Sequence, residues 1–205
     1  MKDQYDRMTA EHLAALFAAP PTDLAQRMGA DYGADGYHLS ALGSPCRITA
    51  EGIHLDGAPA TGVTALLVAL YARHAVAADP VDLPLKAFTE LPDSAPYAAA
   101  FRSHSETVLI PHVAGILANR ELITARFEGR PAPPEVSGDW TILLRPLPKI
   151  SLCYSFYAAD EEFPPAVTCL YSANAERFLP TDALADVAEY TGRAIIEMVE
   201  HSINH

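Results

Sequence analysis

The stretch from Asp139 to Ser172 constrains the fold most, because it is the most strand-like part of the chain. Residues Ile150, Leu152, Tyr154 and Phe156 alternate there with Ser151, Cys153, Ser155 and Tyr157. A period of two is typical of a strand whose two faces meet different surroundings. The run 166–172 is rich in Val, Thr, Leu and Tyr, which also suit a pleated surface. The sequence therefore predicts a late antiparallel hairpin of about 150–157 and 166–172.

The register of this hairpin depends on where its tip lies. If the tip is centred on Glu161, Leu152 faces Leu170 and Cys153 faces Cys169, with Cβ atoms about 4.5–5.5 Å apart. The thiols of Cys153 and Cys169 would then be neighbours, able to bind a soft metal or form a reversible disulfide. We favour the simpler interpretation that both are small buried apolar groups. The third cysteine, Cys46, belongs to no CxxC pair, so neither a disulfide framework nor a zinc ribbon is indicated.

The rest of the chain mixes helical and strand patterns. Residues 140–144 predict a strand of the same sheet, which Pro146 and Pro148 are expected to end because proline has no backbone donor. Residues 46–49 with 53–55 predict a small hairpin. Thr61 is predicted to begin a helix with apolar residues at helical spacing, and Gly29 to end a shorter one. Residues 108–127 are predicted to be helical with a break at Pro111, and a longer amphipathic pattern follows Thr181. We expect an α+β fold with a mostly antiparallel sheet packed by several helices. The length predicts a single domain, 1–205, with residues 1–30 as a helical N-terminal extension packed on it.

Charge and hydropathy exclude several classes of partner. The chain has 14 Lys and Arg against 26 Asp and Glu, a formal charge of −12. Nucleic acids and anionic membrane surfaces both require clustered basic residues, so we expect neither as a partner. No run approaches the roughly 18 apolar residues of a membrane span. The N-terminus is charged and lacks an apolar signal core, which predicts a cytoplasmic location.

Aromatic residues gather in the predicted sheet region together with one cation. Aromatic side chains that line a concave sheet can hold a flat cofactor or small ligand, and a nearby cation can fix its orientation. The competing interpretation is that the same aromatic residues form the hydrophobic core. The candidate ligand-binding residues are Trp140, Tyr154, Phe156, Tyr157 and Arg145.

The acidic hairpin tip is the second candidate feature, with the sequence Asp160, Glu161, Glu162, Phe163 and Pro164. Three carboxylates can in principle bind Mg²⁺ or Ca²⁺, but an extended loop points neighbouring side chains apart. We favour a solvated loop whose charges discourage pairing at the sheet edge, with a structural role for the tip as the alternative. In one version, Glu161 or Glu162 accepts backbone donors or pairs with Arg145 or Lys149. No metal site or catalytic residue is assigned, since GxSxG, HExxH and SxxK patterns are absent.

Three sequence landmarks resemble a known prokaryotic family, the domain of unknown function 3786 family. They are Phe88-Thr89-Glu90-Leu91-Pro92 with Tyr97 and Phe101; Gly138-Asp139 with Leu147-Pro148-Lys149-Ile150; and the tip 160–164 with Phe178-Leu179-Pro180. The resemblance covers roughly residues 20–200. It implies the fold more than a function, because the family has no named activity. Some relatives carry a cysteine-rich iron–sulfur segment, which this chain lacks, so an iron–sulfur role is not carried over and the cofactor is left unassigned.

Three functions follow as hypotheses. The first is a non-catalytic accessory protein that binds a small molecule or cofactor of unknown identity. The second is a metal-assisted enzyme that uses the acidic loop 160–162. The third is a protein-interaction module that meets a basic partner or forms a homodimer. An aromatic-lined pocket of several hundred Å³ favours the first, converging carboxylates with a bound ion favour the second, and a flat, apolar exposed patch favours the third.

Overall fold

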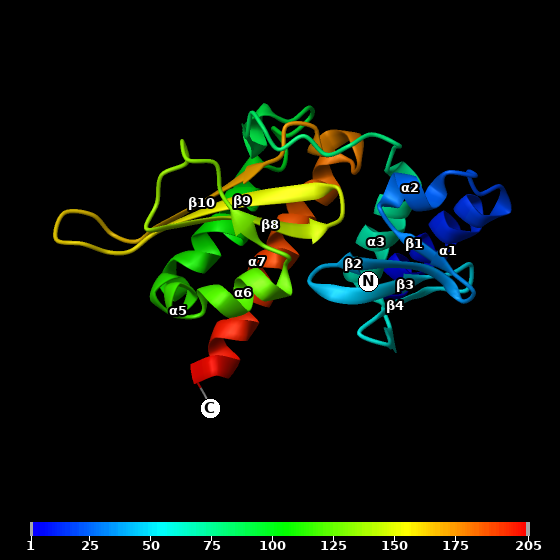
Figure 1. Cartoon of the computed structure of the whole chain (residues 1–205), viewed down its shortest axis with the longest axis horizontal. Coiled ribbons are helices and arrows are strands. Elements are labelled where there is room, and N and C mark those ends of the chain that lie inside the picture. The colour runs from blue at the N-terminus through cyan, green and yellow to red at the C-terminus, as the bar shows by residue number, and fades with distance from the viewer. Residues whose placement is uncertain (1, 204–205) are drawn as a thin grey trace.

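The structure is a computed structural model that describes residues 2–203. Within this range the chain forms two five-stranded antiparallel sheets and a set of helices, which confirms the predicted α+β class. Figure 1 shows the first sheet with α1 and α3 at one side of the molecule, and the second sheet with α5, α6 and α7 at the other. No helix of the described residues combines the length and the apolarity needed to cross a bilayer.

The N-terminal part consists of three helices and a sheet whose strands follow chain order. Helix α1 packs against α3, as Figure 1 shows. Gly29 ends α2 with φ +63, a left-handed conformation that glycine adopts at low cost, and Thr61 precedes α3; both boundaries were predicted. The elements are α1 (Lys2–Ala18), α2 (Leu24–Met28), β1 (Asp31–Gly33), β2 (Gly36–Ala41), β3 (Ser44–Ile48), β4 (Ile53–Leu55), β5 (Ala58–Pro59) and α3 (Gly62–His74).

The C-terminal part contains the second sheet, in the order β6-β10-β9-β8-β7. Its strands are β6 (Lys86–Ala87), β7 (Arg130–Pro131), β8 (Trp140–Leu147), β9 (Ile150–Tyr157) and β10 (Ala166–Tyr171). Its helices are α4 (Ala98–Phe101), a π-helix (Arg102–Glu106), α5 (Val113–Ala118), α6 (Arg120–Arg126) and α7 (Thr181–Ile203). Short 3₁₀ helices span Phe88–Glu90, Thr107–His112 and Ala175–Arg177.

The late hairpin is confirmed, but its predicted register is wrong by one residue. Leu152 pairs with Tyr171, and Cys153 pairs with Leu170. Since side chains alternate along a strand, a shift of one residue exchanges their faces, and Cys153 and Cys169 lie on opposite faces of the sheet. The physical reason is the connecting segment 158–165, whose midpoint falls between Glu161 and Glu162 instead of on Glu161.

One face of the second sheet forms the main hydrophobic core against α7. The hydroxyl of Tyr154 donates to the carbonyl of Ala188 (3.3 Å), and that of Tyr171 donates to Leu184 (2.9 Å). Both buried phenols are therefore satisfied by the helix backbone. The buried residues of this face are Ile142, Leu144, Leu152, Tyr154, Phe156, Val167, Cys169 and Tyr171.

The two sheets meet at Pro146 of β8. The N–H of Leu42, in the turn between β2 and β3, donates to the carbonyl of Pro146 at 2.6 Å. The pairing of β8 with β9 is irregular between Leu144 and Leu147. Proline was predicted to end this strand because it lacks a backbone donor, but β8 continues through the irregularity to Leu147.

Candidate functional site

A pocket of about 440 Å³ lies beside this junction, and we call it the inter-sheet pocket. Its walls come from segments far apart in the sequence: the end of α2, strand β2, strand β8 and the turn between β8 and β9. Gly29 packs closely against the β8–β9 turn, since a Cβ at this position would lie 3.0 Å from Pro148 Cβ. Its charged and ionisable lining residues are Asp31, His38, Glu128, Arg145 and Lys149.

Arg145 is the most informative of these side chains. It is half-buried, its Nε is buried without a hydrogen-bond partner, and among the described residues it has no ion pair. Its backbone is fixed by strand β8 and by an N–H donated to Phe127 O at 2.9 Å. A partly desolvated charge without a partner is costly, so a guanidinium held in this way is suited to an anion that enters the pocket.

Lys149 supplies a second cation to the same pocket. Its side chain is nearly buried, and Nζ donates to the carbonyls of Val76 (3.1 Å) and Ala78 (2.9 Å). These carbonyls solvate the ammonium group without cancelling its charge. Burial lowers the pKa of Lys149, while the Asp79 carboxylate acts in the opposite direction. Lys149 therefore adds positive potential to the wall that carries Arg145.

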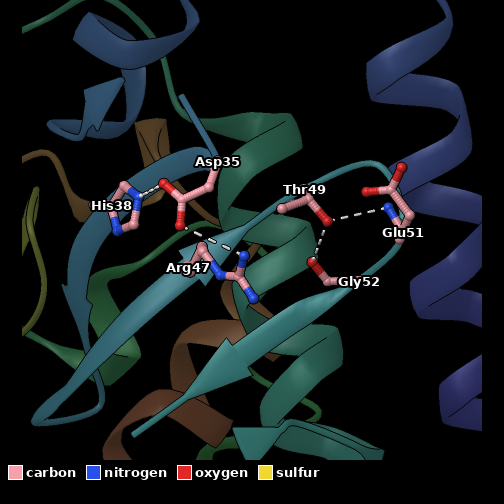
Figure 2. Close-up of polar contacts among 6 residues, drawn as sticks. All are labelled: Asp35, His38, Arg47, Thr49, Glu51 and Gly52. Atoms are coloured by element: carbon pink, nitrogen blue, oxygen red, sulfur yellow. Dashed lines mark hydrogen bonds and ion pairs between the residues drawn. The ribbon is translucent and has the colours of Figure 1, made fainter. Parts of the chain in front are cut away.

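His38 lies at the pocket and is held by an acidic neighbour, as Figure 2 shows. Its Nε2 is 2.8 Å from Asp35 Oδ1, and Arg47 Nη1 is 3.5 Å from Asp35 Oδ2. The hydrogen bond with His38 is the main cause that lowers the pKa of Asp35. His38 and Arg47 are opposite one another on β2 and β3. Because Asp35 also contacts Arg47 on the neighbouring strand, its carboxylate holds the His38 imidazole in place at the edge of the pocket.

A small turn supports this corner of the first sheet. Figure 2 shows Thr49 Oγ1 accepting the N–H of Glu51 (3.2 Å) and donating to the carbonyl of Gly52 (3.4 Å). These bonds close the β3–β4 connection and hold β3, which carries Arg47. Asp31 and Glu128 also line the pocket, and neither has an ion pair among residues 2–203. They remain available to accept hydrogen bonds from hydroxyl or ammonium groups.

The structure separates the five residues that the sequence grouped as a ligand site. Tyr154 and Phe156 are fully buried in the core. Trp140 is half-buried and stacks on Phe156, with ring centroids 5.4 Å apart. Tyr157 lies on the other face of the sheet, where its hydroxyl donates to Ser137 O at 2.7 Å. Of the five, Arg145 alone lines the inter-sheet pocket.

The acidic tip projects beyond the rest of the molecule (Figure 1), and residues 160–164 are exposed. Asp160 organises the turn: its Oδ1 accepts the N–H groups of Glu162 (2.8 Å) and Phe163 (2.7 Å), which lower its pKa. The backbone donors are thus accepted by Asp160, where the sequence interpretation named Glu161 or Glu162. In the described part of the chain, no three His, Cys, Asp or Glu side chains lie close enough together to hold a metal.

Sequence reasoning missed His38, Asp35 and the pocket role of Lys149. One local signal existed: Asp35 precedes His38 by three residues across a Gly-containing turn that enters a strand. Such a spacing lets a carboxylate reach a ring on the first residues of the strand. The contribution of Lys149 had no local signal, because it depends on how the two sheets meet.

Comparison with known proteins gives one family match. A family model described as a domain of unknown function, DUF3786, matches residues 20–194, from just before α2 to within α7. Comparisons with curated proteins and with solved structures gave no match.

Proposed function

Because the chain belongs to the DUF3786 family, whose description names no activity, we propose a function from the geometry alone: the protein binds a small anionic molecule in the inter-sheet pocket. The observation that carries the proposal is the half-buried, unpaired guanidinium of Arg145. In a chain with 26 acidic and 14 basic residues, carboxylates are abundant, so a cation without one is unusual. Here two such cations, Arg145 and Lys149, line the same pocket.

The pocket also indicates the class of ligand. Its volume of about 440 Å³ is in the range of small-molecule sites, roughly 300–1,000 Å³. A guanidinium binds carboxylate and phosphate groups with paired hydrogen bonds, whereas an ammonium group acts as a point charge. Asp31 and Glu128 suit hydroxyl or ammonium groups on the same molecule. We therefore expect a small polar ligand anchored by a carboxylate or phosphate.

Replacing Arg145 tests this proposal. Titration calorimetry with glycerol 3-phosphate and with succinate should detect binding of at least one of them to the unaltered chain. Arg145→Gln should weaken that binding at least tenfold, because hydrogen bonds to charged groups contribute about 1.5–3 kcal/mol. Native mass spectrometry of protein purified from its own host should show a retained anionic molecule that the variant lacks.

The matched control is Arg7→Gln, which removes the same charge from an exposed position on α1 where Arg7 pairs with Glu11. It should change the affinity less than twofold. Equal binding by Arg145→Gln and the unaltered chain would contradict the proposal, as would a retained ligand without an anionic group.

A further inference from the structure

A second pocket, of about 400 Å³, lies between the π-helix and the N-terminal half of α7. We call it the π-helix pocket. It shares no lining residue with the inter-sheet pocket. π-Helical turns are rare and occur frequently at functional sites, which makes this turn worth examining. Its polar and aromatic lining residues are Tyr97, Phe101, His104, Ser105, Asp182, Asp186 and Glu189.

The pocket carries negative charge. Asp182, Asp186 and Glu189 are spaced by four and three residues, which places them along one face of α7. Glu189 contacts Arg193 and lies 3.1 Å from His104 Nδ1, so its charge is partly balanced. Asp186 is half-buried and has no ion pair among the described residues. Asp186 is therefore a carboxylate without an ion-pair partner that is also partly removed from water.

Ser105 gives an independent indication of a ligand. The π-helix places it in the pocket lining, where its side chain is fully buried and its Oγ has no hydrogen-bond partner. A buried hydroxyl without a partner destabilises the folded chain, because it has lost its hydrogen bonds to water and gained none in return. An incoming group that can hydrogen-bond to Ser105 removes this cost.

From these observations we propose that the π-helix pocket binds a small primary ammonium ion, with Asp186 as its counter-ion and Ser105 as a hydrogen-bonding partner. An ammonium group has three N–H donors, which match a carboxylate and a hydroxyl. The rings of Tyr97 and Phe101 also line the pocket, and aromatic faces attract organic cations within about 6 Å. A metal ion fits less well, because no three ligating groups of residues 2–203 lie close enough together.

The titration of Asp186 supports this site. Burial and the neighbouring Glu189 and Asp182 carboxylates raise the pKa of Asp186 to about 6, with Arg193 acting in the opposite direction. His104 faces the same pocket from the π-helix, and Tyr97 from the turn before α4. A bound cation stabilises the ionised carboxylate, so ammonium binding should strengthen as pH rises through 6.

The test uses n-butylammonium as probe and 1-butanol as its neutral counterpart, with binding measured by titration calorimetry at pH 7.5. The ammonium ion should bind and the alcohol should not. Asp186→Asn should weaken ammonium binding at least tenfold, and Ser105→Ala at least threefold. Glu197→Gln removes a charge from an exposed position of α7 outside this pocket, and should change the affinity less than twofold. Unaltered binding by Asp186→Asn, equal binding of the alcohol, or no ammonium binding overturns the proposal.

A stability measurement separates lost binding from lost folding. The pKa of Asp186 is raised from 3.8 to about 6 in the folded chain, so the folded state holds a proton that the unfolded state releases. The free energy of unfolding therefore falls as pH rises from 3.8 to about 6. Above pH 6 it stays at this lower level, because Asp186 is then ionised in both the folded and the unfolded state. Asp186→Asn should therefore melt at a higher temperature than the unaltered chain above pH 6, with the difference vanishing below about pH 4. A variant that melts lower at pH 7.5 would contradict this reasoning.

Discussion

Replacing Phe156 by Ala should lower the free energy of unfolding by about 3–5 kcal/mol, the usual cost of removing a large aromatic side chain from a core. Phe156 is fully buried, and its ring stacks between Trp140 (centroids 5.4 Å apart) and Tyr154 (5.7 Å). The surrounding sheet and helix cannot collapse into the space without breaking this stack. Denaturation in urea should show a lower midpoint with an unchanged slope.

The neighbouring residue provides the control. Tyr157 lies on the opposite face of β9, half-exposed, with its hydroxyl bonded to Ser137 O. Tyr157→Phe removes only that hydrogen bond, so the free energy of unfolding should fall by about 1 kcal/mol or less. If Phe156→Ala also cost less than about 1 kcal/mol, this face would not be core, and a ligand site for its aromatic residues would again deserve testing.

Replacing Gly36 by Ala should lower the free energy of unfolding by about 2–4 kcal/mol, the sum of backbone strain and steric overlap. Gly36 has φ +129, a region that residues with a side chain rarely enter. A Cβ there would lie 2.6 Å from the carbonyl oxygen of Ile48 and 2.9 Å from Thr49 Cγ2. Because Gly36 lies between Asp35 and His38, the shift should also disturb the contact that fixes the imidazole. Urea denaturation measures the first effect.

Gly57→Ala is the matched variant for this experiment. Gly57 has φ +79, but a Cβ there would meet nothing within 4 Å. Gly57→Ala should therefore lower the free energy of unfolding only by the cost of placing a side chain at positive φ, about 1–2 kcal/mol. Equal losses for the two variants would show that no overlap exists at Gly36, and that β2 and β3 pair differently from the register described above.

The sequence predicted those parts of the fold that local patterns determine. The alternation in 150–157 identified β9, and Thr61 and Gly29 marked helix boundaries. The hairpin register was missed because a loop that contains two prolines has no turn type that fixes its midpoint. The region 108–127 is helical as predicted, and its first segment, a 3₁₀ helix, ends at His112, next to the break expected at Pro111; a second division, between α5 and α6, was not predicted. A continuous α-helix and a series of short 3₁₀ and α-helical segments share nearly the same apolar spacing, so periodicity could not distinguish them.

The candidate site was only partly predictable for a similar reason. Arg145 was grouped with aromatic residues because they are close in sequence. Along β8, however, Trp140 and Arg145 are an odd number of residues apart, and the core face continues from Trp140 through Ile142 and Leu144. Because side chains alternate between the two faces of a strand, counting positions from Trp140 would have placed Arg145 on the face opposite the core. Its companions, His38 and Lys149, come from other segments, and only the meeting of the two sheets brings them together.

The junction at Pro146 has a consequence for how copies of this protein behave at high concentration. Strand β7 covers only Ile142 and Leu143 of β8, so the edge of β8 at Arg145 and Pro146 is not paired with another strand of the sheet. This edge nevertheless has few free backbone hydrogen-bonding groups with which a strand from another molecule could pair. Arg145 N–H is occupied by Phe127, Pro146 has no N–H, and the carbonyl of Pro146 is taken by Leu42. An exposed edge with free donors and acceptors is a template for aggregation. Pro146, which lies in the irregular part of β8, therefore protects this edge of the sheet from pairing with a strand of another copy.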